Sequence, residues 1–536
     1  MKKIFTLMML AASSAAAMAT DYNDQLVVVM NGNEIANQQS TIAVDQNQDN
    51  SYKLSINNFV IGAAMPVGNI VVDNVKGIET GGATYLATNQ TIKIAAGNLE
   101  GFGPKDWLGP RLGDVPVVVK AEVRGDKLTA IIDINMALMN QVINVTFGSG
   151  YQIKNSGFED FHKANLYAED GETVTTSSDE PNAWHSFMSS TGEMASFVNS
   201  LPHTFISDSV RPGSNGKKSV LITSSGVQLF PGVVLPIAAN GTLTTGQLQA
   251  GSADATNTLN NAFLDLTNEA VDGNGDPFYS MLNARPDSVA VWVKFKQGEA
   301  DEEDPYATLS AVVTDGTYYQ DPEDKEYSNI VAKAQDKEIA TNGYAWQRLA
   351  IPFDYETYAA NNAEAKAILV TISTNATPGG GSTTDSIFVD DFELIYNSTV
   401  TGINVKGTAV KDFDQATSKY VVGIAGDNAD ITADDIEVLT DAKGAKVFVD
   451  ITDIDEEGVG SVANITVLSA DLKSSSTYVV NTYTEGYLTG IANVEGDSNE
   501  VEAIYNLNGQ RVDSPVKGQV YITKYANGKT VKTIKK

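Results

Sequence analysis

One carboxylate of this chain stands among large apolar side chains. Period-two alternation puts Asp390 on the same strand face as Phe388, Phe392, Leu394 and Tyr396. An isolated buried carboxylate is costly, so Asp390 requires hydrogen bonds, a bound cation or its own proton. The residue types leave two interpretations open, which are a cation site and a carboxylate that caps backbone amides at a β-bulge.

Two tryptophans beside basic residues are candidates for binding sugar. Trp292 lies near Lys294, and Trp346 near Arg348, on strand faces opposite the apolar rows. An exposed aromatic ring can stack on the C–H face of a sugar ring, while neighbouring polar groups hydrogen-bond the hydroxyls. The alternatives are peripheral packing and cation–π contact with the basic neighbours, worth about 0.5–1 kcal/mol when exposed.

A further candidate for binding sugar is the pair Trp184-His185, which follows Pro181 in an irregular stretch. The chain has only two other histidines, His162 and His203, and no cysteine. Disulfides, thiolate metal sites and cysteine catalysis are therefore excluded. A three-histidine zinc site would require all three imidazoles to converge.

The sequence contains no catalytic motif that we recognise. It has no HExxH helix, no nucleophile elbow and no phosphate-binding glycine loop followed by lysine. With 67 acidic residues, chance carboxylate pairs are many, so composition does not indicate a glycosidase. The acidic run Asp272–Asp276 resembles the start of a calcium loop, but Pro277 replaces the required glycine, which predicts a tight turn.

The formal net charge of −31 makes nucleic-acid binding unfavourable, because an acidic surface repels phosphate backbones. At the N-terminus, Lys2 and Lys3 precede a short apolar run, and Ala17-Met18-Ala19 supplies small residues. These features predict a secretory signal peptide cleaved after Ala19. The apolar run is too short for a transmembrane anchor, and no other stretch approaches that length.

The segments that must position these residues are predicted to be β-strands. Alternation is clear from Leu128 to Met136 and from Val289 to Phe295, and Gly125 supplies a hairpin turn. We therefore expect an all-β chain with the following parts: signal peptide 1–19, a barrel at 20–150, a jelly-roll sandwich at 151–398, an immunoglobulin-like sandwich at 399–485, and a short β-domain at 486–536.

The first β-rich part resembles the calycin-like (lipocalin-like) β-barrel domains of exported bacterial proteins. Three stretches carry the resemblance, and they are 51–59, 65–71 and Trp107-Leu108-Gly109-Pro110. The resemblance covers nearly all of residues 20–150. It implies a barrel with a pocket at its mouth and no established ligand.

The central part resembles the putative carbohydrate metabolism domain (PCMD) of bacterial surface proteins. The opening Gly157-Phe158-Glu159, Trp184-His185, the strand 288–296 and the closing strand 388–396 carry this resemblance. It implies a galactose-binding-like jelly roll that recognises carbohydrate. Related jelly rolls often hold a structural calcium near their first and last strands, which makes Glu159, Asp390 and Asp391 candidate calcium ligands.

The last fifty residues resemble the C-terminal sorting domain of type IX secretion cargo. The resemblance rests on the order of 504–512, Lys517-Gly518, Tyr521-Ile522 and Asn527-Gly528-Lys529. Gln519 and Val520 are inserted relative to the tightest form of the motif. The resemblance implies the type IX secretion machinery as a partner.

Together these features predict an exported protein, extracellular or on the outer cell surface, that binds a glycan or polysaccharide without catalysis. A glycoside-active enzyme is the second hypothesis. A structural adhesin that binds protein rather than sugar is the third. Hydrolysis of a bound glycan would separate the first two, and adhesion without glycan binding would favour the third.

Overall fold

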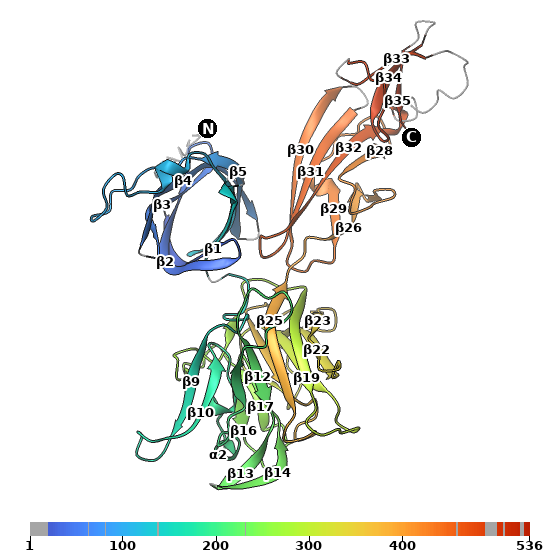
Figure 1. Ribbon diagram of the computed structural model, residues 1–536. Coiled ribbons are helices and arrows are strands. Elements are labelled where there is room, and N and C mark those ends of the chain that lie inside the picture. Colours follow the sequence, from blue (N-terminus) through green and yellow to red (C-terminus); the bar gives the residue numbers. More distant parts are fainter. Residues whose placement is uncertain are drawn as a thin grey trace, which may run out of the picture. The chain divides into compact units, whose positions relative to one another are not determined.

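The computed structural model describes residues 20–535, except 63, 81, 137–138, 149, 231, 457–458, 488–500, 508–509 and 526–529. The predicted signal peptide lies outside the described residues, as do Asn508, Gly509 and 527–529 of the predicted sorting motif. The regular structure is almost entirely β-strand, as predicted (Figure 1). The chain forms two compact units, one of Met1–Ala284 with Val289–Leu394 and one of Arg285–Ser288 with Ile395–Lys536.

The N-terminal strands close into a barrel, drawn in blue in Figure 1. Each strand pairs antiparallel with the next, and β8 returns to β1. The strands are β1 (Thr20–Met30), β2 (Asn33–Gln46), β3 (Tyr52–Ile61), β4 (Met65–Thr80), β5 (Ala83–Ile92), β6 (Val115–Arg124), β7 (Lys127–Met136) and β8 (Gln141–Phe147). A short helix, α1 (Gly109–Leu112), lies between β5 and β6. Closure removes the unpaired sheet edges, which confirms the predicted barrel.

The barrel core follows from the alternation of its strands. Along β7, Leu128, Ala130 and Met136 are buried while Asp133 is exposed. Arg124 pairs with Lys127, so β6 and β7 meet in the predicted two-residue turn, where Gly125 adopts a φ of 60°. Buried apolar side chains from all eight strands form one cluster.

The central part contains two five-stranded sheets (Figure 1). The first, which we call sheet F, has the order β11 (Thr204–Ser207), β12 (Ser219–Thr223), β25 (Ser386–Ile395), β19 (Ser288–Lys296) and β23 (Gln347–Pro352). The second has β15 (Thr242–Thr244), β24 (Ala367–Ser373), β20 (Ala307–Thr314) and β22 (Ile330–Ile339), with β18 (Ser280–Met281) on β24. Both sheets join strands that are distant in sequence, as expected of a jelly-roll sandwich.

Smaller elements complete this part. The two-stranded sheets are β9 (Phe161–Tyr167) with β10 (Val174–Pro181), and β13 (Ser225–Phe230) with β14 (Val233–Ala239). A three-stranded sheet contains β16 (Gln247–Ala250), β17 (Asn260–Leu264) and β21 (Tyr319–Asp321). The helical turns are η2 (Phe187–Ser189), α2 (Ala195–Val198) and η3 (Ala359–Asn361).

Strand β25 departs from the predicted alternation. Ile387 and Val389 are buried while Phe388 is half-buried, so Phe388 points to the other face of sheet F. The phase then changes, because Asp390 is buried directly after Val389 and Asp391 adopts a φ of 43°. The expectation that Phe388 and Asp390 share a face with Phe392 is therefore wrong.

The second unit contains three sheets. Two of them share a buried apolar core, consistent with the predicted immunoglobulin-like sandwich. One of these sheets has the order β27 (Thr408–Ala409), β26 (Val400–Val405) and β29 (Ile436–Thr440). The other has the order β28 (Lys419–Ile424), β32 (Ser475–Thr484), β31 (Val459–Leu468) and β30 (Lys446–Glu456). The helical turn η4 (Ala433–Asp435) precedes β29. The third has β33 (Val501–Tyr505), β34 (Val520–Tyr525) and β35 (Thr530–Ile534). Within the described ranges, no helix has the length and apolar character needed to cross a membrane.

Candidate functional site

Three aromatic rings surround one lysine on the solvent-facing side of sheet F. The Nζ atom of Lys294 lies 4.2 Å from the ring centre of Phe388, 4.7 Å from that of Tyr344 and 5.5 Å from that of Trp346. Lys294 also donates a hydrogen bond to Ser209 Oγ at 2.9 Å. Partial burial lowers the pKa of the Lys294 ammonium. We call Lys294, Tyr344, Trp346 and Phe388 the aromatic face.

Strand pairing extends the aromatic face with further apolar side chains. Leu221 of β12 pairs with Phe388 of β25 and with Phe205 of β11, so the three side chains form a row on one side of sheet F. All three are half-buried, and Tyr344 is 43% exposed. The row and the rings present apolar surface that is partly accessible to solvent, which a sugar-binding surface requires.

Trp346 and Trp292 occupy different surroundings. Trp346 belongs to the aromatic face, next to the exposed Arg348. The ring of Trp292 lies 5.7 Å from the guanidinium carbon of Arg211, whose Nε donates to Asp391 Oδ2 at 2.6 Å. Both rings therefore have a cation–π contact, but not with the predicted neighbours. Arg211 rather than Lys294 lies over Trp292, and Lys294 rather than Arg348 lies over Trp346.

The structure removes Trp184 and His185 from the candidates for stacking on sugar. Both side chains are fully buried. Trp184 packs between Phe158 and Phe392 at ring-centre distances of 5.0 and 5.6 Å, and its Nε1 donates to the carbonyl of Lys154. A ring enclosed in this way offers no face to a sugar, so Trp184 belongs to the hydrophobic core.

The three predicted calcium ligands do not come together at one site. Glu159 accepts hydrogen bonds from the backbone amides of Lys217 and Lys218 at 2.9 to 3.1 Å. Asp391 binds Arg211, as described above. Among the described residues, the one group of three possible metal ligands that converges contains none of Glu159, Asp390 and Asp391.

Asp390 has the surroundings of a carboxylate that caps the backbone. Its Oδ2 accepts a hydrogen bond from the amide of Arg211 at 2.8 Å, while its Oδ1 has no hydrogen-bond partner among the described residues. Burial, with a smaller contribution from the neighbouring Asp391, raises the pKa of the Asp390 carboxyl to about 6. The amide contact beside the left-handed Asp391 matches the β-bulge interpretation left open by the sequence.

Sequence reasoning missed a buried group of ionisable side chains in the same domain. His162, Glu180 and Asp272 bring one nitrogen and two oxygens within 4.8 Å of one another, and His185 lies beside them. The predicted tight turn at Asp272 is confirmed, but turn chemistry does not indicate that its side chain enters this group, and Glu180 carries no sequence signal. In the sequence, only the histidines indicated a possible metal site, because His162 and His185 are two of the three imidazoles in the chain.

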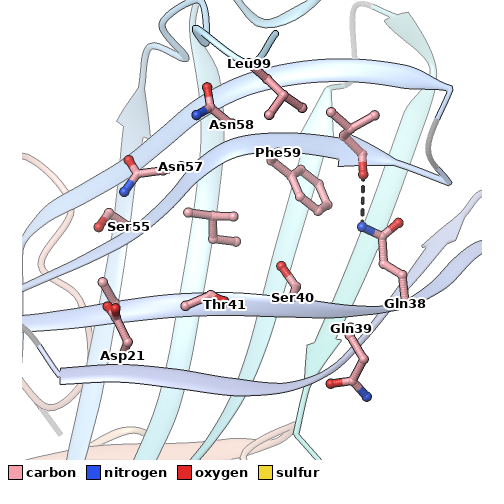
Figure 2. A pocket seen from close by; sticks show the side chains of 13 residues that line it. Asp21, Gln38, Gln39, Ser40, Thr41, Ser55, Asn57, Asn58, Phe59 and Leu99 are labelled. Atoms are coloured by element: carbon pink, nitrogen blue, oxygen red, sulfur yellow. Dashed lines mark hydrogen bonds between the residues drawn. The ribbon is translucent and has the colours of Figure 1, made fainter. Parts of the chain in front are cut away.

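The barrel has a groove in its wall. Strands β2 and β3 pair only from Ala43–Ser55 to Gln46–Tyr52, and beyond that point they separate. Gln38 bridges the gap by donating to the carbonyl of Val60, the bond drawn as a dashed line in Figure 2. It also accepts from the amide of Gly62. The groove has a volume of about 360 Å³, and its lining is largely polar. Its polar side chains include Ser40, Thr41, Ser55, Asn57 and Asn58.

Comparison with known proteins assigns the first two domains. The model of the calycin-like beta-barrel domain matches residues 18–149, and the model of the putative carbohydrate metabolism domain matches residues 157–395. No curated protein matches the chain. A crystal structure of a putative outer membrane protein from Bacteroides fragilis NCTC 9343 is similar over 66% of this chain and 96% of its own, at 9% identity and a TM-score of 0.18, too low to support an argument. The chain therefore carries a calycin-like β-barrel domain followed by a putative carbohydrate metabolism domain.

Proposed function

We propose that the chain is an exported, non-catalytic carbohydrate-binding protein, and that the aromatic face of sheet F contacts the glycan. The observation that carries this proposal is the cluster of partly exposed rings within the domain that matches the carbohydrate metabolism family. Trp346 and Tyr344 would stack on the C–H faces of sugar rings, and Arg348 and Lys294 would hydrogen-bond the hydroxyls.

Location supports the same proposal. The N-terminal residues read as a signal peptide, and the C-terminal residues resemble a type IX sorting domain, whose described part forms the sheet of β33, β34 and β35. Both features would deliver the aromatic face to the outer cell surface or the medium, where polysaccharides are available. Removal of residues 486–536 should leave the chain in the periplasm, as detected by fractionation of the producing cells.

The decisive experiment is a glycan array probed with the full mature chain, with and without calcium. Selective binding that Trp346→Ala weakens by about 1–3 kcal/mol, by analogy with base–aromatic stacking, would support the proposal. Tyr318→Ala is the matched control, because Tyr318 is a similarly exposed ring (38%) of the same domain that lies outside the aromatic face. Equal loss in both variants, or no binding by the unmodified chain, would contradict it.

Two further readouts separate the alternatives. Release of reducing sugar from a bound glycan would show a glycoside-active enzyme rather than a binding protein. Adhesion to protein without glycan binding would show a structural adhesin. Calcium binding is tested separately. If this domain holds a structural calcium ion, the melting temperature of the domain should rise with added calcium.

A further inference from the structure

Three lone-pair-bearing atoms converge within 4.8 Å of one another in the interior of the carbohydrate metabolism domain, and a fourth, from His185, lies beside one of them. They come from β9 (His162), from β10 (Glu180), from the segment after β10 (His185) and from the turn at Asp272. Asp272 Oδ2 lies 3.6 Å from His162 Nε2 and 3.5 Å from His185 Nδ1. Glu180 Oε2 lies 3.7 Å from His162 Nε2. We call these four residues the buried polar group.

None of these four atoms has a hydrogen-bond partner among the described residues, although all are buried. The Glu180 side chain and the Asp272 side chain are each 1% exposed, that of His185 is 0% and that of His162 is 11%. The separations of 3.5 to 3.7 Å are too long for the O–H or N–H hydrogen bonds that would explain them without a ligand. Buried polar atoms in native proteins are nearly always satisfied, so this convergence requires an explanation.

The other atoms of the same side chains are fully engaged, and they fix the orientation of the converging ones. Glu180 Oε1 accepts from the amide of Ser186 at 2.7 Å and from its hydroxyl. Asp272 Oδ1 accepts from the amides of Asn274 and Asp276 at 2.9 and 2.8 Å. Each carboxylate therefore presents its second oxygen to the centre of the group.

The imidazoles are held in the same way, because the other ring nitrogen of each faces a hydrogen-bond partner. His185 Nε2 lies 3.2 Å from the carbonyl of Pro277, which can only accept, so Nε2 carries the proton and Nδ1 presents a lone pair. His162 Nδ1 lies 3.1 Å from Asn182 Oδ1, which leaves Nε2 to face the two carboxylates. In this orientation, the unpartnered nitrogen of each imidazole faces a carboxylate oxygen.

We propose that His162, Glu180 and Asp272 bind a divalent transition-metal ion, zinc. His185, whose Nδ1 lies 3.5 Å from Asp272 Oδ2, is the candidate for the fourth position. Zinc binds histidine nitrogen and carboxylate oxygen at about 2.0–2.2 Å in tetrahedral geometry, which separates its ligands by about 3.3–3.6 Å. Metal binding requires deprotonated ligands, so the carboxylates of Glu180 and Asp272 would together carry two negative charges in the bound state, which would balance the ion.

The remaining contacts match a structural zinc site. Ligating histidines commonly donate their other N–H to a carbonyl or similar oxygen, and ligating carboxylates are themselves hydrogen-bonded. Calcium fits less well, because it takes 6–8 oxygen ligands and the buried polar group supplies two imidazoles. Bound zinc would tie the β9–β10 hairpin to the segment at His185 and to the turn at Asp272, and so hold the region around Trp184.

The test is metal analysis of the full mature chain, produced without a histidine tag and purified without chelator. We expect about one zinc ion per chain. After chelation, added zinc should raise the melting temperature, whereas added calcium should leave it unchanged. Cobalt should give the visible absorption of a four-coordinate nitrogen and oxygen site. Failure of the unmodified chain to bind stoichiometric zinc, or equal stabilisation by calcium, would overturn the proposal.

Two conservative variants identify the ligands. Asp272→Asn and Glu180→Gln keep the acceptor oxygen that holds each side chain in place and remove the charge, so zinc affinity should fall by at least about 100-fold. Asp179→Asn is the control, because Asp179 neighbours Glu180 but pairs with Lys163 outside the group. Unchanged affinity in Asp272→Asn and Glu180→Gln would contradict the assignment. If a variant does not fold, zinc and cobalt binding by the unmodified chain still decides the question.

Discussion

The aromatic face and the buried polar group belong to one domain, yet they differ in whether their polar atoms have partners. On the aromatic face, Lys294 lies against three rings and donates to Ser209. In the buried polar group, Glu180 Oε2 and Asp272 Oδ2 point at imidazole nitrogens without a hydrogen bond. The face therefore needs no ligand to satisfy its polar atoms, whereas the group contains buried polar atoms without a hydrogen bond, which the proposed cation would satisfy. A sugar would bind the first weakly and reversibly, while an ion would contribute to the fold through the second.

The largest expected effect separates a core tryptophan from one on the aromatic face. Trp184→Ala should destabilise the domain by about 3–5 kcal/mol, because Trp184 is fully buried and packs on two phenylalanine rings. Calorimetry of the full chain should show the domain's transition at lower temperature. Trp346→Ala serves as the comparison and should cost no more than about 1 kcal/mol. Equal losses would mean that the aromatic face is itself part of the core.

A second prediction concerns the pH dependence at Asp390. Because the folded pKa of about 6 exceeds the ordinary 3.8, the folded state holds this proton more tightly than the unfolded state. The stability that this carboxyl contributes is fully present below about pH 3.8 and is lost as the pH rises through 6. Asp390→Asn should remove that loss, which we expect to be about 1–2 kcal/mol between pH 4 and 7.

The measurement for Asp390 is urea unfolding of the variant and the unmodified chain at several pH values. The amide of the variant can still accept from Arg211, so the backbone contact should survive. Glu393→Gln is the control, because Glu393 is an exposed carboxylate of the same strand. An unchanged slope in Asp390→Asn would show that other groups cause the pH dependence.

A smaller effect tests how the aromatic face is held together. Lys294→Gln should reduce stability by about 0.5–1 kcal/mol, because it removes the cation from three rings. The rings should also become more mobile, visible as weaker near-ultraviolet circular dichroism. A variant as stable as the unmodified chain would show that the rings pack without help from the ammonium group.

The smallest stability effect should come from Arg348→Ala. Arg348 is exposed, so the free energy of unfolding should stay within about 0.5 kcal/mol. Glycan affinity should nevertheless fall if the aromatic face is the binding surface. A matched control is Lys337→Ala, because Lys337 is an exposed residue of β22 in the other main sheet. A loss of binding in both variants would point to general charge attraction instead.

Local pattern was sufficient for the strands and for the division of the central domain's residues between two faces. Alternation in β19 predicted that Val289, Val291, Val293 and Phe295 are inside, and all four are fully buried. The same rule was wrong in β25, because the left-handed backbone at Asp391 shifts the phase by one residue. Such an irregularity depends on the neighbouring strand and on Arg211, which alternation cannot represent.

The sequence by itself determined the all-β class, the β6–β7 hairpin of the barrel and the outward position of Trp292, Lys294 and Trp346. These properties depend on residues close together in the chain, whose period-two pattern decides which side meets water. Tertiary structure alone decided that Trp184 is core, that Glu159 caps distant backbone amides, and that His162, Glu180, His185 and Asp272 converge. These four residues lie in separate segments, and only the folding of those segments against one another brings their side chains together.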